Sequence, residues 1–465
     1  MTIAATEEPL VSSGVRADVV KIAEKRVALI MTETQQPSTK PALAMIKGGR
    51  LSSQEFSSLP FSQKIERIRE MPSRKRLDLL TEDPEGKELT RAFVPQEFYL
   101  LVKEVGETDA VPLLANCSAE QLVFCLDLEL WEKWDFRFDQ ACTWLGYMLS
   151  TGEDHFWALL RELDWELLQL ILLEGIEVGG GVGELSTDAE RLGDWDHSID
   201  NLYFITFRAS KHARLLGSLI DVLYRHNHPL YMTLMDGCRA SVKSELEELC
   251  YQFKSGRLAD LGFPDYDQAI EIYLPIPPEA YALSDGKSSI AADVYSIALL
   301  SASDNGDTLL ARVLQSSSSD ALQQELGYLF NCAIIAEKGA MPDNDTIGII
   351  SSRVYGWLNI ALEHLAGSNE AKGKEIVKKE YLKRLFRLGC GIVQEVSRLA
   401  KSVHSDNYAT SKALRGFTAQ RPRFYRGLDP DHADGYREFQ TIDDVRRAKE
   451  FLLIASTATE SDSPR

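Results

Sequence analysis

Length, composition and charge limit the classes of protein to which this chain can belong. It has 465 residues, of which 44% are hydrophobic and 26% charged, and this balance is typical of a globular protein and excludes disorder along the whole chain. At roughly 150 residues per domain, the length suggests about two to three domains. The net charge of −19 repels phosphate backbones and anionic lipids, so we expect no nucleic-acid partner.

The cysteines and the N-terminus indicate the compartment. The seven cysteines include no CxxC pair and mostly have apolar neighbours, which is typical of buried, reduced thiols and not of a disulfide framework or a zinc site. The N-terminus lacks the basic and apolar regions of a signal peptide. The most apolar run, 167–176, is about half as long as a membrane span. We therefore expect a cytoplasmic protein without membrane insertion.

Helical periodicity dominates the chain. Apolar residues recur at spacings of three and four over 202–223 and 382–399, which predicts two long amphipathic helices. Strand-like alternation with tight Asn-Gly or Asp-Gly turns is nearly absent, so the predicted fold class is all-α. In the second half of the chain, helices are expected at 293–301, 309–314, 321–337, 346–365 and 375–403.

A repeat with a spacing close to 34 residues indicates helical hairpins near the N-terminus. The apolar segments 78–80 and 112–114 begin similar patterns, each followed by another helical segment. A unit of this length covers its apolar face by stacking on its neighbours, which favours a solenoid-like block packed with a C-terminal helical domain. An irregular helical bundle remains the alternative.

Composition suggests where these parts begin and end. A Gly-rich loop at 178–183 and a Pro-rich stretch at 274–278 mark two of the boundaries. The predicted parts are a flexible arm at 1–55, solenoid-like hairpins at 56–180, a helical continuation at 181–285, a helical domain at 286–410, an irregular segment rich in Arg and aromatic residues with a last helix at 411–455, and a tail at 456–465.

Three segments carry a resemblance to a known family. They are SGRLADLGFPDY at 255–266, which follows SELEEL at 244–249, then QELGYLFN at 324–331 and RPRFYRGL at 421–428. With these the chain resembles a family of uncharacterised bacterial proteins that is defined only by a domain of unknown function, and the resemblance implies no activity or ligand. Separately, residues 60–175 look like the cytosolic helical superhelix of MgtE-type magnesium transporters, but the chain lacks their transmembrane block.

The first candidate site lies in the segment 239–265. Its charged residues include Glu245, Arg257 and Asp260, and Arg257 stands between two glycines that permit tight turns. A guanidinium can form a bidentate pair with a carboxylate. The favoured interpretation is therefore a structural turn that an ion pair of Arg257 stabilises. A ligand or partner site is the alternative.

The second candidate is the segment 415–437, where arginines alternate with aromatic residues. Arg423 and Arg426 could grip a phosphate or carboxylate while the rings stack on a base. No Gly-rich phosphate loop accompanies them, so packing of this segment against acidic groups of the helical domain is favoured. We expect no cofactor.

Metal binding has weak support. His226 and His228 are two residues apart and cannot share one helical face, so capping of a helix end explains them better than a metal site does. Several Trp and Phe residues between 131 and 165 have helical spacing and are expected mostly in the core, although exposed ones would anchor a partner.

The sequence therefore favours a cytosolic α-helical scaffold or protein–protein interaction protein, because no nucleophile, base and orienting group occur together in a recognisable motif. The alternative is an enzyme or small-anion sensor with a ligand site between the helical blocks. That alternative requires Arg257, Arg423 and Arg426 to converge, with Glu245 or Asp260 as an acid or base.

Overall fold

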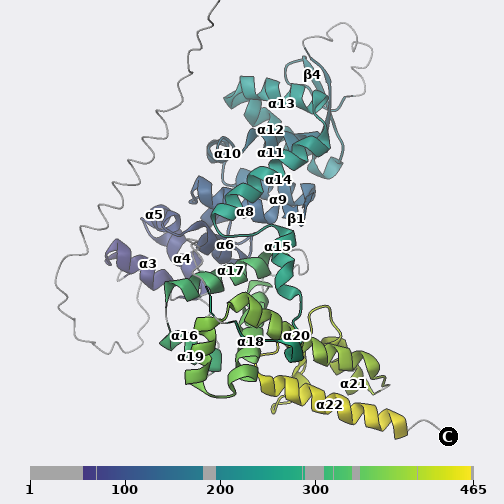
Figure 1. Ribbon diagram of the computed structural model, residues 1–465. Coiled ribbons are helices and arrows are strands. Elements are labelled where there is room, and N and C mark those ends of the chain that lie inside the picture. Colours follow the sequence, from purple (N-terminus) through teal and green to yellow (C-terminus); the bar gives the residue numbers. More distant parts are fainter. Residues whose placement is uncertain are drawn as a thin grey trace, which may run out of the picture. The chain divides into compact units, whose positions relative to one another are not determined.

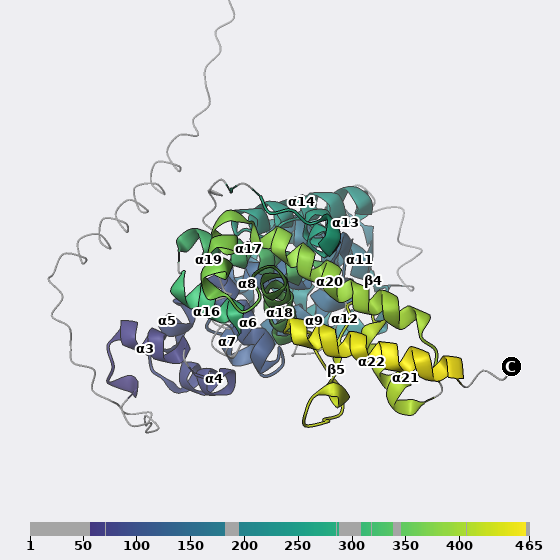
Figure 2. The same ribbon diagram turned by 60° about the horizontal axis from the view of Figure 1, so that its bottom comes forward.

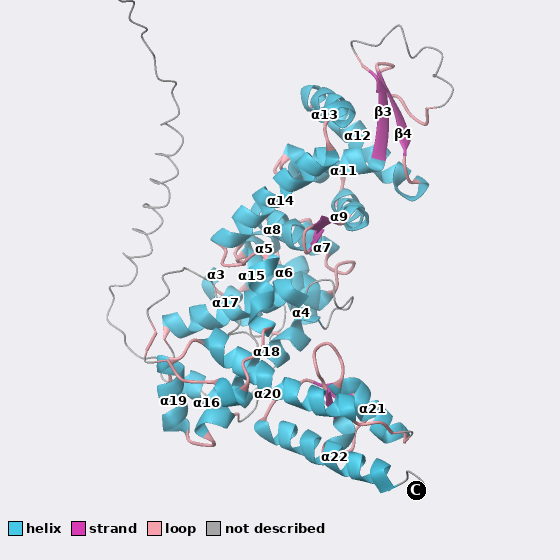
Figure 3. Ribbon diagram, turned by 45° about the vertical axis from the view of Figure 1, so that its right-hand side comes forward, coloured by secondary structure: helices cyan, strands magenta, loops and turns pink. Residues whose placement is uncertain are grey.

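The computed structural model describes residues 56–69, 71–181, 195–284, 286–287, 308–317, 319–337, 346–405 and 407–461, all of which belong to one compact unit, 53–465. The predicted arm at 1–55 and the helix predicted at 293–301 lie outside the described residues. Most described residues are helical, as Figures 1 and 3 show, so the predicted all-α class is confirmed at this level.

The N-terminal block is built from short helices that pack on partners close in the chain. Helix α4 packs on α6, α6 on α8, and α9 on both α10 and α11. Such neighbour-to-neighbour packing is typical of helical hairpins, while the solenoid arrangement itself stays a prediction. The helices are α3 (Phe61–Arg69), α4 (Ser73–Glu82), α5 (Gly86–Arg91), α6 (Pro95–Val105), α7 (Val111–Leu114), α8 (Ala119–Glu129), α9 (Phe138–Ser150), α10 (Glu153–Leu160) and α11 (Trp165–Gly175).

Short antiparallel strand pairs interrupt the helices. Strand β3 (Ile176–Gly180) pairs with β4 (Tyr203–Phe207), and both lie beside α12 and α13 (Figure 3). Two predictions were wrong here. The Gly-rich loop at 178–183 is partly strand, and the helix predicted at 202–223 begins only at Ser210. The reason is that Tyr203 and Ile205 are buried with period two in an aromatic and β-branched run, which suits a pleated strand.

Two smaller pairs are β1 (Trp131–Glu132) with β2 (Asp135–Phe136), and β5 (Phe424–Tyr425) with β6 (Tyr436–Arg437). The first is a tight hairpin with Lys133 at a φ of 58°. The middle of the chain otherwise contains α12 (Ser210–His226), α13 (His228–Ala240), α14 (Lys243–Asp260), α15 (Tyr266–Ile270), and the 3-10 turns η2 (Glu271–Tyr273) and η3 (Pro278–Ala280).

The second half is organised around α18 and α20, which pack closely on each other. Helix α22 lies beside α20, as Figure 2 shows. The helices are α16 (Leu309–Ser316), α17 (Asp320–Glu337), α18 (Thr346–Ala366), α19 (Glu370–Lys379), α20 (Leu382–Ser402), α21 (Tyr408–Phe417) and α22 (Ile442–Ser461), with the 3-10 turn η6 (Arg426–Leu428) after β5.

Two boundaries in this half differ from the predicted ones. The helix predicted at 375–403 is interrupted at Glu380, whose backbone is extended and whose buried carboxylate accepts hydrogen bonds from the backbone and hydroxyl of Ser284. Ser284 is 96 residues away from Glu380 in the sequence. The local apolar periodicity therefore does not predict that the helix is interrupted there. Helix α22 continues to Ser461, into the segment predicted as a tail.

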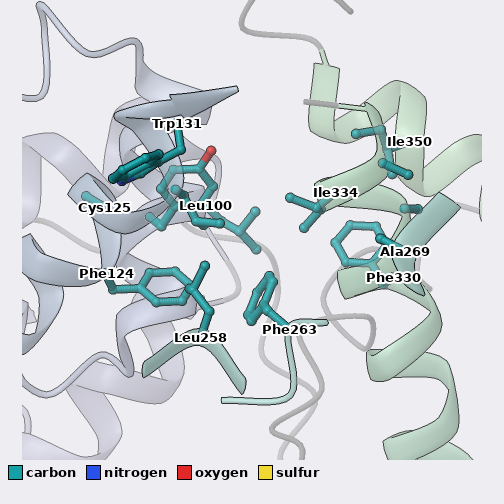
Figure 4. Packing of buried hydrophobic residues seen from close by; sticks show 14 of the residues in the cluster. Leu100, Phe124, Cys125, Trp131, Leu258, Phe263, Ala269, Phe330, Ile334 and Ile350 are labelled. Carbon is teal, nitrogen blue, oxygen red and sulfur yellow. The ribbon is translucent and has the colours of Figure 1, made fainter. Parts of the chain in front are cut away.

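The core is continuous across these parts. Phe263, just after α14, packs edge-on against Phe124 of α8 with ring centroids 5.4 Å apart. Figure 4 shows it between Phe124 and Leu258 on one side and Phe330 of α17 on the other. Among the residues that the structure describes, no helix combines the length and apolarity needed to cross a membrane.

Candidate functional site on helix α14

Three of the residues singled out in the sequence, Glu245, Arg257 and Asp260, belong to α14. The helix begins after Val242, which has an extended backbone, and is followed by Gly262, whose φ of 77° favours glycine. One side of the helix is buried through Leu246, Cys250 and Leu258, with spacings of four and eight residues.

Arg257 locks this buried side to the N-terminal block. Its Nε donates to Asp127 Oδ2 at 2.8 Å and its Nη2 donates to Asp127 Oδ1 at 2.7 Å. Its Nη1 donates to Asp164 Oδ2 at 2.7 Å. This is the bidentate arrangement predicted for Arg257, and with two carboxylates already bound the guanidinium is a structural anchor of α14.

The electrostatics of this anchor follow from burial. Burial raises the pKa of Asp127, and the hydrogen bonds and charge of Arg257 oppose that rise. For Arg257 itself, burial lowers the pKa, but Asp127 and Asp164 outweigh it and hold the pKa above its usual value. The Arg257 guanidinium is charged with or without a partner, and its charge offsets part of the cost of burying the Asp127 carboxylate.

Two further contacts hold the helix. Lys254 is buried with its ammonium over the ring of Tyr251 at 4.5 Å and that of Trp131 at 6.0 Å, and burial lowers its pKa. The backbone N–H of Phe136 donates to Glu247 Oε1 at 3.0 Å. Helix α14 is therefore held against α8 and the hairpin β1–β2, and it also packs closely on α11.

The remaining side of α14 faces solvent and is partly apolar. Val242 is 54% exposed, and Leu249 and Phe253 are each 37% exposed. Leu249 and Phe253 are four residues apart and lie along one line of the helix, and Val242 immediately precedes the helix. Glu245, Glu248 and Asp260 are exposed on the same solvent-facing side. We call this set of six residues the α14 face.

Arg423 and Arg426 lie elsewhere, in the segment around β5. Arg423 Nε is 3.4 Å from Glu438 Oε1, and Arg426 Nη2 donates to Asp431 Oδ2 at 3.4 Å. Glu438 is buried and also accepts two hydrogen bonds from Arg353. Arg423 and Arg426 thus pair with carboxylates of their own segment, while Arg421 reaches the helical domain with its Nε 3.3 Å from Glu337 Oε1.

The same segment contains a second ionic cluster, centred on Arg437. Arg437 donates to both Asp429 and Asp444 at 2.8 Å, and its guanidinium lies 4.2 Å from the centroid of the Phe424 ring. Arg447 contacts the same two carboxylates. The Phe424 ring thus contacts arginines of the chain itself, since Arg447 also lies 5.3 Å from its centroid.

The structure does not bring the proposed anion-binding arginines together. Helix α14, which carries Arg257, and α21, which ends shortly before Arg423, are well separated in Figures 1 and 3. No hydrogen bond or ion pair of the described residues joins the two groups. The ligand site predicted from their convergence is therefore not formed by these residues.

The histidines and cysteines show no metal-binding geometry within the described ranges. His226 stacks on Trp157 with ring centroids 5.3 Å apart, and its Nε2 lies 3.4 Å from Glu153. No group of three or more His, Cys, Asp or Glu residues in the described part of the chain is placed to hold a metal. Burial raises the pKa of each of several cysteines to about 12, namely Cys117, Cys142, Cys238, Cys250, Cys332 and Cys390.

Sequence reasoning missed two features of this site. It did not identify Asp127 and Asp164 as the partners of Arg257, since nothing near them in sequence points to a residue 130 or 93 positions away. It also did not separate exposed from buried apolar residues of α14. Local spacing gave no signal for this division, because Leu249 and Phe253 lie three and seven residues after the buried Leu246, which is the spacing of a single helical face.

The predicted aromatic cluster divides between core and surface. Trp131, Trp144 and Phe156 are buried, as expected for core residues. Trp134 and Trp165 are 50% and 46% exposed. Some aromatic side chains are thus available as anchors for a partner, as the alternative interpretation required.

Comparison with known proteins identifies the family and nothing more specific. No curated protein matches the chain, and no solved structure matches it. The similarity of residues 60–175 to the MgtE superhelix stays a prediction. A family model matches residues 53–460, which include all three segments on which the resemblance was based, and the chain thus belongs to the family of unknown function DUF6178.

Proposed function

We propose that this protein is a non-catalytic α-helical interaction protein that binds a partner through the α14 face. The observation that carries the proposal is the division of one helix into two sides. Arg257 and the buried apolar residues hold one side rigidly, while Val242, Leu249 and Phe253 present an apolar line to solvent. A rigid, exposed apolar line lowers the ordering cost of binding.

The charges beside this line specify the chemistry of the partner. Glu245, Glu248 and Asp260 are exposed carboxylates, and the whole chain carries a net charge of −19. A complementary partner presents apolar side chains on one side of a helix and Lys or Arg residues next to them. We therefore propose a basic amphipathic helix as the partner.

The chemistry of the cysteines supports a binding role in a reducing compartment. None of the seven cysteines forms a disulfide bond. With pKa values raised to about 12 for most of them, little thiolate is present at neutral pH, and the thiolate is the nucleophilic form. Free thiols are typical of cytosolic proteins, and we propose that the protein works in the cytoplasm.

The test is binding of a labelled helical peptide, measured by fluorescence anisotropy with the full-length protein. The peptide carries Leu at every third or fourth position and Lys beside each Leu, and a control peptide carries Glu in place of Lys. We expect the Lys peptide to bind at least tenfold more tightly than the Glu peptide. The double variant Leu249→Asp, Phe253→Asp should lose this binding.

A matched control is Phe61→Asp, because Phe61 is 41% exposed but lies on α3. This variant should bind the Lys peptide like the unmodified protein. If the Leu249→Asp, Phe253→Asp protein remained folded by circular dichroism and bound the Lys peptide equally well, the α14 face would not be the binding surface.

A further inference from the structure

A cavity of about 610 Å³ lies where α14 and η2 meet α17 and α20. Its volume is within the range of small-molecule sites, about 300–1,000 Å³. Neither the candidate residues from the sequence nor the α14 face includes its lining. The lining residues are Ala259, Gly262, Ile272, Gln324, Glu325, Tyr328, Leu329, Cys332, Tyr381, Lys383 and Arg384.

Two segments that carry the family resemblance meet at this cavity. Ala259 and Gly262 come from the segment 255–266, and Tyr328 and Leu329 come from 324–331. The buried side chain of Asn331 joins the segments directly, since its Nδ2 donates to the backbone oxygen of Gly262 at 3.1 Å. The cavity wall is thus held by a specific contact between residues 69 positions apart.

The floor of the cavity is apolar and uncharged. Its exposed surface includes Ala259 and Tyr328, while Ile272, Leu329 and Cys332 lie behind it with almost no exposed surface. Burial raises the pKa of both the Cys332 thiol and the Tyr328 hydroxyl to about 12, so both groups are neutral at neutral pH. This floor suits a hydrocarbon chain and supplies no nucleophile.

The rim of the cavity carries positive charge at the start of α20. Lys383 Nζ pairs with Glu271 Oε2 at 2.8 Å, and both side chains are partly exposed, so this pair is weak and a ligand anion can take the place of Glu271. Arg384 is more firmly held, because it donates to Ser284 Oγ at 2.9 Å and to the oxygen of Ala282 at 3.0 Å. Lys383 is therefore the cation available to a ligand.

Neighbouring carboxylates limit the charge of that ligand. Glu325 lines the cavity, pairs with Lys287 at 2.6 Å and accepts the backbone N–H of Leu382 at 3.1 Å. Together with Glu271 it would repel a group with two negative charges, such as a phosphate monoester at neutral pH. A single carboxylate matches Lys383, which among the described residues lining the cavity is the cation with the more weakly held partner.

We propose that this cavity binds a molecule with an apolar chain and one carboxylate, such as a medium-chain fatty acid. The chain lies against Ala259 and the ring of Tyr328, in front of the buried Ile272, Leu329 and Cys332, and the carboxylate pairs with Lys383. This inference goes beyond the interaction role of the α14 face and does not depend on it.

The experiment is isothermal titration calorimetry of the full-length protein with decanoate, using 1-decanol, decylamine and acetate as matched probes. We expect decanoate to bind at least tenfold more tightly than decanol, which has the chain without the charge. Decylamine and acetate should show no binding. Equal affinities for decanoate and decanol would overturn the proposed role of the carboxylate.

Two variants locate the ligand. Lys383→Met should reduce the affinity for decanoate about tenfold, to that of decanol, and leave the affinity for decanol unchanged. Ala259→Trp should abolish binding of both, since Ala259 is on the exposed side of α14 and a larger side chain can enter the cavity without entering the core. Retained binding in a folded Ala259→Trp protein would overturn the assignment to this cavity.

The matched control for Ala259→Trp is Gly256→Trp. Gly256 is exposed on the same helix, does not line the cavity and has no atom within 4 Å of an added Cβ. It should bind decanoate like the unmodified protein. Loss of binding in a folded Gly256→Trp protein as well would overturn the assignment to this cavity, because Gly256 does not line it.

Discussion

The buried side chain of Arg353 donates to both carboxylate oxygens of Glu438, from Nε at 2.9 Å and from Nη2 at 3.1 Å. The pair joins α18 to the segment before α22, 85 residues later. Arg353 also contacts Glu337 at the end of α17. Burial raises the pKa of Glu438, and the charge and hydrogen bonds of Arg353 oppose that rise. These contacts fix the C-terminal segment onto the helical domain.

Replacing Arg353 with Met should therefore lower the free energy of unfolding by about 3–5 kcal/mol, because Glu337 and Glu438 would remain buried with less compensation. Urea unfolding followed by circular dichroism measures this loss. Arg426→Met is the control, since Arg426 and its partner Asp431 are 43% and 60% exposed, and it should cost less than about 1 kcal/mol. Similar losses in both variants would contradict this account.

Replacing Arg257 with Ala should destabilise the protein by about 1–3 kcal/mol, less than for a fully buried pair because the Arg257 side chain is 35% exposed. Asp127 would then be buried without its main partner. Adding Asp127→Asn should recover part of the loss, because the amide carries no charge. A double variant less stable than Arg257→Ala alone would refute the ion-pair explanation.

The loss in Arg257→Ala should also depend on pH. Burial already raises the pKa of Asp127, and removal of Arg257 raises it further. A carboxyl whose pKa is higher in the folded state disfavours folding above that pKa, and the penalty disappears as the pH falls and the group takes a proton. Urea unfolding at about pH 5 should thus show a smaller difference from the unmodified protein than at about pH 7. If the two proteins differed by the same free energy of unfolding at both pH values, Asp127 would not be the source of the loss.

Gly389→Ala should destabilise the contact between α18 and α20. A Cβ at Gly389 would lie 2.0 Å from the backbone oxygen of Trp357, so the two helices would have to separate, at a cost of at least about 2 kcal/mol. Gly256→Ala is the matched control. An added Cβ there meets no atom within 4 Å, and alanine should stabilise the exposed helix α14 by about 0.5–1 kcal/mol. If Gly389→Ala and Gly256→Ala shifted the melting temperature in the same direction, the explanation by close contact at Gly389 would be wrong.

The cysteines should react slowly in the folded protein. Most of the seven are buried, and burial raises the pKa of several to about 12. Ellman's reagent should modify few thiols in the native protein at neutral pH and all seven in denaturant. Rapid modification of all seven without denaturant would contradict the described burial.

Local spacing in the sequence was sufficient to predict the helical class and several boundaries. Helices α16, α17 and α18 lie within a few residues of the predicted ranges, because a 3.6-residue apolar period is a property of each helix alone. The pairing of Arg257 with a carboxylate was also predictable, since a partly buried guanidinium on a helix that packs in the core requires a partner.

Local spacing failed where distant contacts control the backbone. Leu202 and Ile205 fit a helical period, yet the strand β3 pairs with 203–207 and makes it β4. Glu380 fits the middle of a helix, yet its bonds to Ser284 interrupt that helix. In both places tertiary contacts outweigh local propensity.

Sequence alone therefore specifies that this chain forms amphipathic helices, that it is acidic, and that it belongs with proteins sharing its three characteristic segments. It does not specify that Asp127 is the partner of Arg257, that Asn331 reaches Gly262, or that an apolar cavity with Lys383 at its rim forms between these helices. Those features arise from residues 130 and 69 positions apart, which meet only when the helices pack against one another and bury their apolar sides in one core.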